Sequence, residues 1–269
     1  MMKSTVGAVF NISQVSAEII IGIPPLVVLN KINKIKHYLK LNINDKSHDR
    51  LTQLIKKSAS STKPLVEISV ALKETFQFLQ WKMQNYPRNI QANDADIINT
   101  NSVELFFNIS PEACAYSKNM MTAYTEYLWK KVVTNVYLGN GYSVIPSPSC
   151  KPLAVPSDTT RKTEVLMMSC LYDNNLMNNF LYQRDLNNTP MCPHCDVEVH
   201  TPYHAVVECE GIDQQYRDCV KQALASALGE ESASIETTVT LLNASRCREF
   251  MEACKDILEN YNFRTDIEI

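Results

Sequence analysis

Glycine is scarce in this chain, with six residues among 269. Antiparallel barrels and sandwiches need many tight turns, and glycine is the usual residue at such turns, so the composition argues against an all-β fold. Hydrophobic residues nevertheless make up 45% of the chain, which is enough to bury a core. The composition therefore predicts a mostly α-helical protein.

A long hydrophobic run is also missing. The run Ile19–Leu29 contains Pro24 and Pro25 and is shorter than the ~20 residues that a transmembrane helix needs. Residues 1–10 hold only a short apolar stretch, which does not resemble a signal peptide. We therefore expect no membrane partner, no secretion and a location in the nucleus or cytoplasm.

Cysteine is well represented but lacks the pattern of a disulfide framework. The nine cysteines are an odd number and have no regular spacing. Without a secretory signal, reduced thiols are the expected state, and some of them are expected to bind a metal.

Charge is unevenly distributed along the chain. Residues 1–65 contain ten lysines and arginines against three acids, a balance of +7, so the net charge of −3 leaves −10 for the remainder. A polyanion would meet the basic N-terminal third first. The alternative is that these lysines are simply a solvated surface.

The apolar spacing predicts helices separated by proline-rich or polar links. Three regions follow: a basic helical region (1–90), a linker with a long helix (91–157, with an extended connector at 142–157) and a helical zinc-finger module (158–262). The predicted helices are Val15–Ile21 ending at Gly22, one from Pro25, Ser47–Lys57, Pro64–Met83, Ser110–Tyr137, Asp158–Leu171, Asn175–Asp185, and two or three more ending near Asn260.

The helix from Pro25 is amphipathic and basic. One stripe of it is apolar, and lysines lie mostly on the other side. The stripe is Val28, Ile32, Ile35 and Leu39, and the lysines are Lys31, Lys34, Lys36 and Lys40.

A cysteine and histidine cluster near residue 200 has the spacing of a zinc site. The pattern is Cys-x2-Cys-x8-His-x4-Cys, formed by Cys192, Cys195, His204 and Cys209. A Cys-x2-Cys turn directs two thiolates at one tetrahedral ion, and a short helix starting at Thr201 is expected to supply the other two ligands. Because four protein ligands leave no open position, the zinc would be structural, and the expected fold is a helical array with a small zinc-stabilised finger.

Other assignments of this segment are weaker. His200 would give a zinc-knuckle spacing, but Ala205 stands where that pattern needs cysteine, and His194 lies between the paired cysteines and points away. A redox Cys-x-x-Cys pair normally begins a helix after a strand, a context that this segment lacks.

With the cluster in view, the chain resembles the C-terminal region of the reverse-transcriptase polyprotein of non-LTR retrotransposons. That region has a Cys-Cys-His-Cys finger of the same spacing. Residues 21–26, followed by a lysine-rich helix with Tyr38 and Leu39, resemble the stretch after the polymerase thumb. Residues 179–186, leading through Thr189 to Cys192, resemble the segment before the finger. The resemblance implies binding of template RNA or target DNA.

The chain also departs from that family. Residues 171–173 read Leu-Tyr-Asp where the family usually has Thr-Gly-His, and no Tyr/Phe-x-Asp-Asp box or ribonuclease H motif is present. The sequence also lacks a phosphate-binding glycine loop and a Gly-x-Ser-x-Gly elbow. We therefore expect no enzymatic activity and no small-molecule substrate.

Two functions remain open from the sequence. The first is a non-catalytic nucleic-acid-binding module, with Lys31, Lys34, Lys36, Lys40 and Arg184 as contacts. Residues 151–190 carry four basic and four acidic side chains, so the finger's surroundings are neutral. The second function is a zinc-stabilised scaffold that binds a protein partner.

Overall fold

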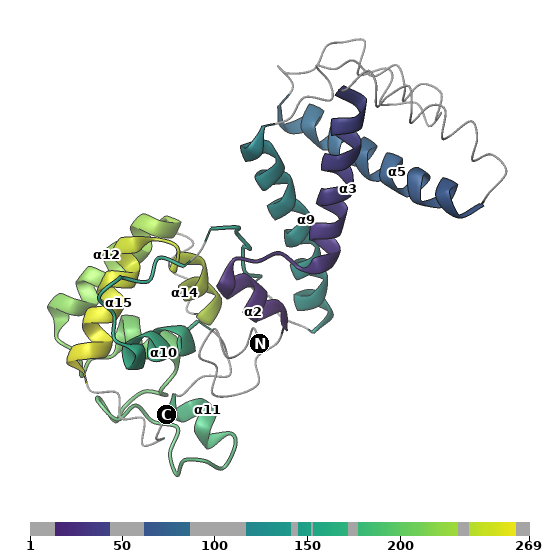
Figure 1. Ribbon diagram of the computed structural model, residues 1–269. Coiled ribbons are helices and arrows are strands. Elements are labelled where there is room, and N and C mark those ends of the chain that lie inside the picture. The colour runs from purple at the N-terminus through teal and green to yellow at the C-terminus, as the bar shows by residue number, and fades with distance from the viewer. Residues whose placement is uncertain are drawn as a thin grey trace. The chain divides into compact units, whose positions relative to one another are not determined.

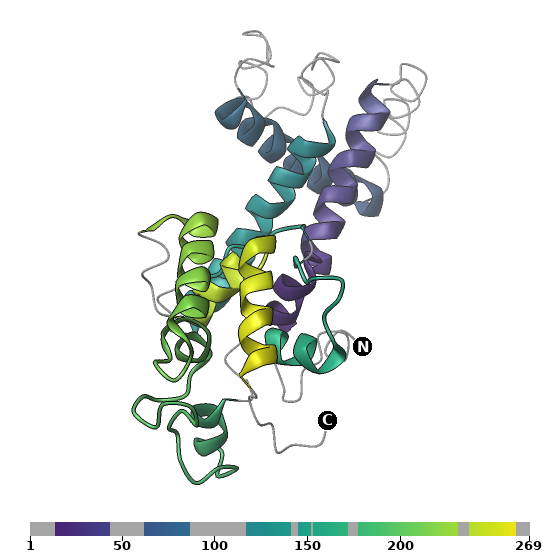
Figure 2. The same cartoon turned by 90° about the vertical axis from the view of Figure 1, so that its left-hand side faces the viewer.

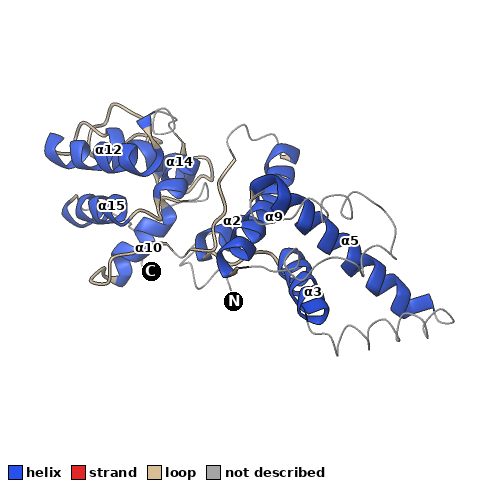
Figure 3. Ribbon diagram, turned by 90° about the horizontal axis from the view of Figure 1, so that it is seen from above, coloured by secondary structure: helices blue, strands red, loops and turns tan. Residues whose placement is uncertain are grey.

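The computed structural model describes residues 14–43, 62–86, 117–140, 145–151, 153–171, 177–230 and 237–261. Helices account for 68% of this part, and its only β pairing is an isolated antiparallel bridge between Met191 and Val199. Figure 3 shows helices and loops alone among the coloured residues. The predicted mostly helical fold is confirmed.

The helices follow one another along the chain as Figure 1 shows. They are α2 (Gln14–Ile21), α3 (Leu26–Ile43), α5 (Thr62–Asn85), α9 (Lys118–Gly139), α10 (Arg161–Ser169), α11 (Asn178–Tyr182), the π-helix η2 (His204–Glu208), α12 (Gln214–Leu228), α14 (Thr238–Ala244) and α15 (Arg248–Asn260).

The chain divides into two compact units. The first consists of residues 1–23 and 130–269, and the second of residues 24–129, so the division falls within α9. We call them the C-terminal unit and the α3–α5 unit. The three-region division expected from the sequence stays a prediction.

Gly22 ends α2, as its position in the sequence predicts. Its φ is +75°, a left-handed conformation that favours glycine. The N–H groups of Gly22 and Ile23 both donate to the carbonyl of Glu18, at 3.0 and 3.1 Å, which satisfies the end of the helix. A Cβ at Gly22 would lie 2.8 Å from the Lys151 carbonyl oxygen, so a larger residue would also clash.

The α3–α5 unit is built on the predicted apolar stripe of α3. Figure 1 shows α3 crossing α5. The stripe residues Val28, Ile32, Ile35 and Leu39 are all buried, which confirms the predicted amphipathic helix.

The buried face of α5 differs in part from the prediction. The apolar spacing of this segment predicts a stripe that includes Leu72, Phe76, Leu79 and Met83. Leu72 and Leu79 are buried, but Phe76 and Met83 are only half-buried. Phe78 and Trp81 are buried instead, because their rings pack against Tyr124 of α9, with centroids 5.1 and 5.0 Å away. Trp81 and Trp129 are both buried in the core of this unit.

Side-chain hydroxyls cap the starts of α9 and α10. Ser117 caps α9 by accepting a hydrogen bond from the Met120 N–H at 3.1 Å, whereas the predicted start at Ser110 lies outside the described residues. The predicted helix Ser47–Lys57 lies outside them too. α10 begins at Arg161 rather than Asp158, because the Thr160 hydroxyl accepts from the Thr163 N–H and makes Thr160 the N-cap.

The C-terminal unit holds the remaining helices. α15 packs against both α12 and α10 (Figure 2). Asp213 caps α12 and Thr237 caps α14, each through its side chain. Arg246 donates a hydrogen bond to the Ile19 carbonyl at 2.8 Å, which joins α2 to the turn after α14.

Within the described ranges, no single helix is long and apolar enough to cross a membrane. Residues Gln14–Ile21 and Leu26–Lys40 pass the test of length and composition only as a pair, bent by 54° at their break.

Candidate metal centre

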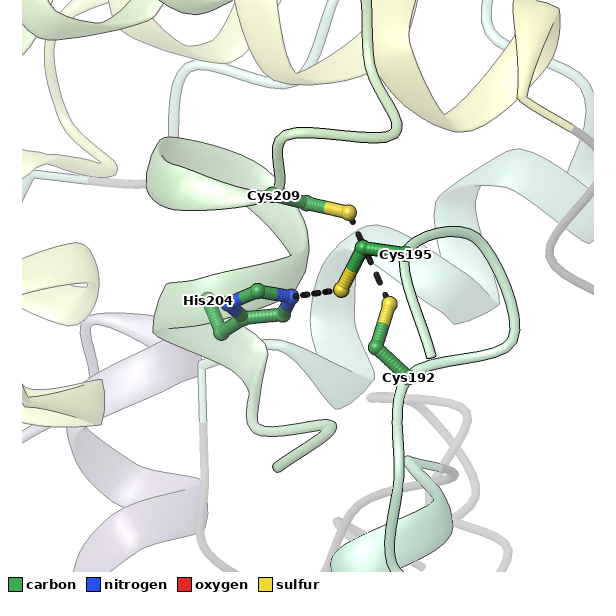
Figure 4. Close-up of side chains that lie close together, drawn as sticks. All are labelled: Cys192, Cys195, His204 and Cys209. Carbon is green, nitrogen blue, oxygen red and sulfur yellow. Dashed lines mark hydrogen bonds between the residues drawn. The ribbon is translucent and has the colours of Figure 1, made fainter. Parts of the chain in front are cut away.

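The four predicted ligands lie together in the C-terminal unit (Figure 4). The ligand atoms of Cys192, Cys195, His204 and Cys209 are all within 4.8 Å of one another. Cys192 Sγ lies 3.5 Å from Cys209 Sγ, and Cys195 Sγ lies 3.4 Å from His204 Nε2. The imidazole therefore presents its Nε2 atom to the cluster.

These distances fit a tetrahedral zinc ion. With Zn–S bonds of about 2.3 Å and Zn–N bonds of about 2.0–2.1 Å, the edges of the tetrahedron are roughly 3.8 Å between sulfurs and 3.6 Å between sulfur and nitrogen. The Cys192–Cys209 and Cys195–His204 separations are within a few tenths of an ångström of these edges, and the other four are no longer than 4.8 Å. Three thiols and one imidazole are a common donor set for structural zinc. The cluster could thus hold one metal ion with all four positions filled by protein.

A tight turn positions Cys192 and Cys195. The Cys192 N–H donates to the Glu198 carbonyl at 2.8 Å, and the Asp196 N–H donates back to the Cys192 carbonyl at 2.9 Å. Asp196 closes the turn with φ +54°, a conformation that aspartate tolerates better than most residues. The turn brings both sulfurs to the same side of the chain.

Backbone N–H groups point at all three cysteine sulfurs. They come from two or three residues further along the chain and would stabilise the thiolates that a metal requires. The donors are His194 and Cys195 for Cys192, Val197 and Glu198 for Cys195, and Gly211 for Cys209.

Burial and hydrogen bonding act in opposite directions on these thiols. Burial raises the pKa of Cys192, and it raises that of Cys209 to about 12, with further contributions from Cys192 beside it. Burial also acts to raise the pKa of Cys195, but the N–H groups of Val197 and Glu198, together with the Cys192 and Cys209 side chains, outweigh it and the pKa is lowered.

The turn η2 brings His204 and Cys209 to the same side. Thr201 begins the helical segment as predicted, since its hydroxyl accepts from the His204 N–H at 3.1 Å. The Cys209 N–H then donates to the His204 carbonyl at 2.9 Å, a bond between residues five apart. This widened π turn places the His204 and Cys209 side chains one above the other. In an α-helix, with 3.6 residues per turn, residues five apart would point in different directions. Cys209 stands one residue beyond the helix, not on it as expected.

The two rejected histidines have structural partners. Nδ1 of the buried His200 accepts a hydrogen bond from the Asn178 N–H at 3.1 Å. Burial lowers the pKa of His200 to about 3, with the charges of His194 and His204 adding to the effect, so the ring is neutral. The His194 ring lies edge-on to Tyr261, with centroids 6.3 Å apart. Neither ring belongs to the metal cluster.

Gly211 supports the cluster and was not predicted. A Cβ at this position would lie 2.4 Å from the carbonyl oxygen of His194. The chain after Cys209 can therefore approach the Cys192–Cys195 turn only because residue 211 has no side chain. A glycine two residues after the last ligand is the only sequence signal for this role.

The predicted nucleic-acid contacts lie in both units. On α3, Lys34 and Lys40 are exposed, while Lys31 and Lys36 are half-buried at the border of the apolar stripe. Arg184 is exposed in the C-terminal unit, where its guanidinium carbon lies 4.6 Å from the centre of the Phe180 ring. Their role in binding stays a prediction.

The assignment of the metal site rests on the geometry of this chain and not on related proteins. No protein family, curated protein or solved structure matches the chain. The resemblance to a retrotransposon polyprotein stays a prediction, and the Cys/His cluster is the feature that the fold itself supports.

Proposed function

We propose that this chain is a non-catalytic nucleic-acid-binding module, stabilised by one structural zinc ion and similar in role to the post-polymerase region of a non-LTR retrotransposon polyprotein. The observation that carries the proposal is the basic character of α3. Between Leu26 and Ile43 the helix has four lysines and no acid. The opposite face of α3 is buried against the unit's core, which fixes the helix and keeps its lysines on one surface that a polyanion can bind.

The charge of the two units supports the same reading. The described residues of the α3–α5 unit include eight lysines and three acids. Those of the C-terminal unit include eleven basic and fifteen acidic side chains. A polyanion would therefore be attracted to the α3–α5 unit and repelled by the other.

The zinc ion has a structural role in this proposal. Four protein ligands would leave no coordination position for water or substrate, which is the arrangement of structural rather than catalytic zinc sites. The site joins the turn before η2 to the start of α12, so its contribution is to hold the C-terminal unit together.

A salt titration of binding tests the proposal. The full chain, loaded with zinc, is titrated against labelled RNA and DNA by fluorescence anisotropy at several salt concentrations. Each phosphate neutralised by a lysine contributes a slope of about −0.7 to −0.9 in log K against log salt. Lys34→Gln with Lys40→Gln should weaken binding about tenfold and reduce the slope by about 1.5.

A matched variant controls for net charge. Lys130→Gln with Lys221→Gln removes two exposed lysines from the C-terminal unit and should leave binding unchanged. Weak binding by the wild type, without a steep salt slope, would refute the proposal.

A second candidate function is a scaffold that docks a protein partner. It is favoured by exposed apolar side chains around the finger and by the net negative charge of the C-terminal unit. The side chains are Tyr182, Leu186, Val197 and Val199, which are 41–69% exposed. A zinc-loaded chain that binds no nucleic acid in the titration would favour this function.

A further inference from the structure

Two exposed tyrosine rings flank a buried tryptophan in the α3–α5 unit. Tyr86 follows the last residue of α5, and Tyr127 lies within α9. They are 36% and 38% exposed, whereas Trp81 between them is 8% exposed. We call Tyr86, Trp81 and Tyr127 the aromatic ledge.

Ring contacts hold the ledge in place. The Trp81 ring centre lies 5.8 Å from that of Tyr86 and 5.8 Å from that of Tyr127. Tyr127 also stacks on Tyr124, at 5.8 Å with an angle of 24° between the planes. Because Tyr124 and Trp81 are buried, the exposed rings rest on a rigid aromatic base rather than on mobile side chains.

A lysine of α3 lies close to the ledge along α5. Lys31 Nζ donates a hydrogen bond to Gln77 Oε1 at 3.1 Å. Gln77 precedes Trp81 by four residues, so the two side chains are one turn apart on the same face of α5. Lys31 of the basic helix therefore contacts α5 about one helical turn from Trp81, the centre of the ledge.

Among the residues that the structure describes, acidic groups near the ledge are few. Glu74 of α5 and Glu126 of α9 are both half-buried, and Glu74 is close enough to Tyr124 to contribute to the raised pKa of its hydroxyl, which is due first to burial. Lys82 is buried, but the other seven lysines of the described unit still outnumber its three acids, so the surface remains basic.

We propose that the aromatic ledge stacks unpaired bases of a single-stranded nucleic acid whose phosphates follow the lysines of α3. Aromatic rings beside a positively charged track are the arrangement that recognises single strands, because only unpaired bases expose their faces. In a duplex the bases are stacked on one another, and the ledge would have nothing to contact. This inference rests on the proposed nucleic-acid-binding function and specifies its ligand.

Ring substitutions test the ledge. The full zinc-loaded chain is titrated by anisotropy with an oligouridylate of about 15 nucleotides and with an RNA duplex of about 15 base pairs. Tyr86→Leu with Tyr127→Leu removes both exposed rings, and Tyr86→Phe with Tyr127→Phe keeps them. The leucine variant should bind the single strand about tenfold to a hundredfold more weakly and the duplex as wild type does. The phenylalanine variant should bind both as wild type does.

A second readout is the tryptophan fluorescence of chains that keep both exposed tyrosine rings. Oligouridylate should quench the fluorescence of Trp81, and the quenching should persist in a Trp129→Phe variant, so it does not depend on the leucine variant folding. Absence of quenching, or unchanged single-strand affinity in a folded leucine variant, would overturn the ledge proposal while leaving nucleic-acid binding intact. Failure of the wild type to bind either ligand would instead overturn the proposed function.

Discussion

His204 and His194 differ in what their rings contact. His204 Nε2 lies 3.4 Å from Cys195 Sγ, and the His194 ring packs against Tyr261. We therefore expect His204→Ala to reduce bound zinc from about one equivalent to near zero, because a tetrahedral site loses a ligand. His194→Ala should keep its zinc, and metal analysis of the purified variants measures both.

Substitution of the cysteines tests the same zinc site. A double Cys192→Ser, Cys195→Ser variant should lose zinc, and Cys219→Ser should not, because Cys219 is exposed and outside the cluster. Equal zinc content in the double variant and the wild type would refute the site.

Gly211 is expected to be intolerant of substitution. In Gly211→Ala the new methyl group would meet the His194 carbonyl oxygen at 2.4 Å. Relief of that clash requires the turn of Cys192–Cys195 or the start of α12 to shift, which costs about 1–3 kcal/mol of stability. Gly139→Ala is the control, because a Cβ there meets nothing within 4 Å. Denaturant unfolding of both variants, each compared with wild type, measures the difference.

At the scale of elements, His200 joins the finger to α11. Its neutral ring accepts from the Asn178 N–H, and burial lowers its pKa from 6.5 to about 3. His200 is therefore protonated at a lower pH in the folded chain than in the unfolded chain. Its contribution to folding stability is complete above pH 6.5 and is lost as the pH falls. Between pH 6.5 and 5 the loss should be about 2 kcal/mol.

A glutamine at position 200 separates this effect from zinc release. His200→Gln keeps an acceptor for the Asn178 N–H but does not titrate, and all four ligands remain. Urea unfolding at saturating zinc should show a pH-dependent loss smaller by about 2 kcal/mol in the variant. An identical loss in both proteins would show that His200 does not contribute.

Helix ends and ligands were predictable where the sequence carries a local signal. Gly22 ends α2, Thr201 caps the segment that holds His204, and the ligand spacing indicates the metal cluster. The π turn was not predictable, because the spacing of apolar residues does not distinguish a turn with hydrogen bonds between residues five apart from an irregular loop. The buried face of α5 was only partly predicted, since Phe78 and Trp81 turn toward Tyr124, a partner distant in sequence.

At the scale of the whole molecule, zinc removal should affect the two units unequally. The cluster leads directly into α12, and the Asp213 N–H at the α12 cap donates to the Tyr261 hydroxyl beyond α15 at 2.7 Å. Chelation should therefore loosen both helices. The α3–α5 unit has its own buried core and contains none of the four ligands.

Hydrogen exchange measured by mass spectrometry tests this difference. After chelation, peptides from residues 204–228 and 248–261 should lose protection, and those from 26–40 and 70–85 should keep it. Readdition of zinc should restore the protection of the peptides from 204–228 and 248–261. Uniform loss across all four regions would show that the units unfold together.

The widened turn between His204 and Cys209 has a consequence for changes in chain length. Deletion of one residue between them would leave a spacing of four, which an ordinary α-helix places on one face. Insertion of one residue would leave a spacing of six, which neither kind of helix brings together. Related chains that keep the metal should therefore tolerate a shortening of this segment more readily than a lengthening, which only the residue beyond the helix could absorb.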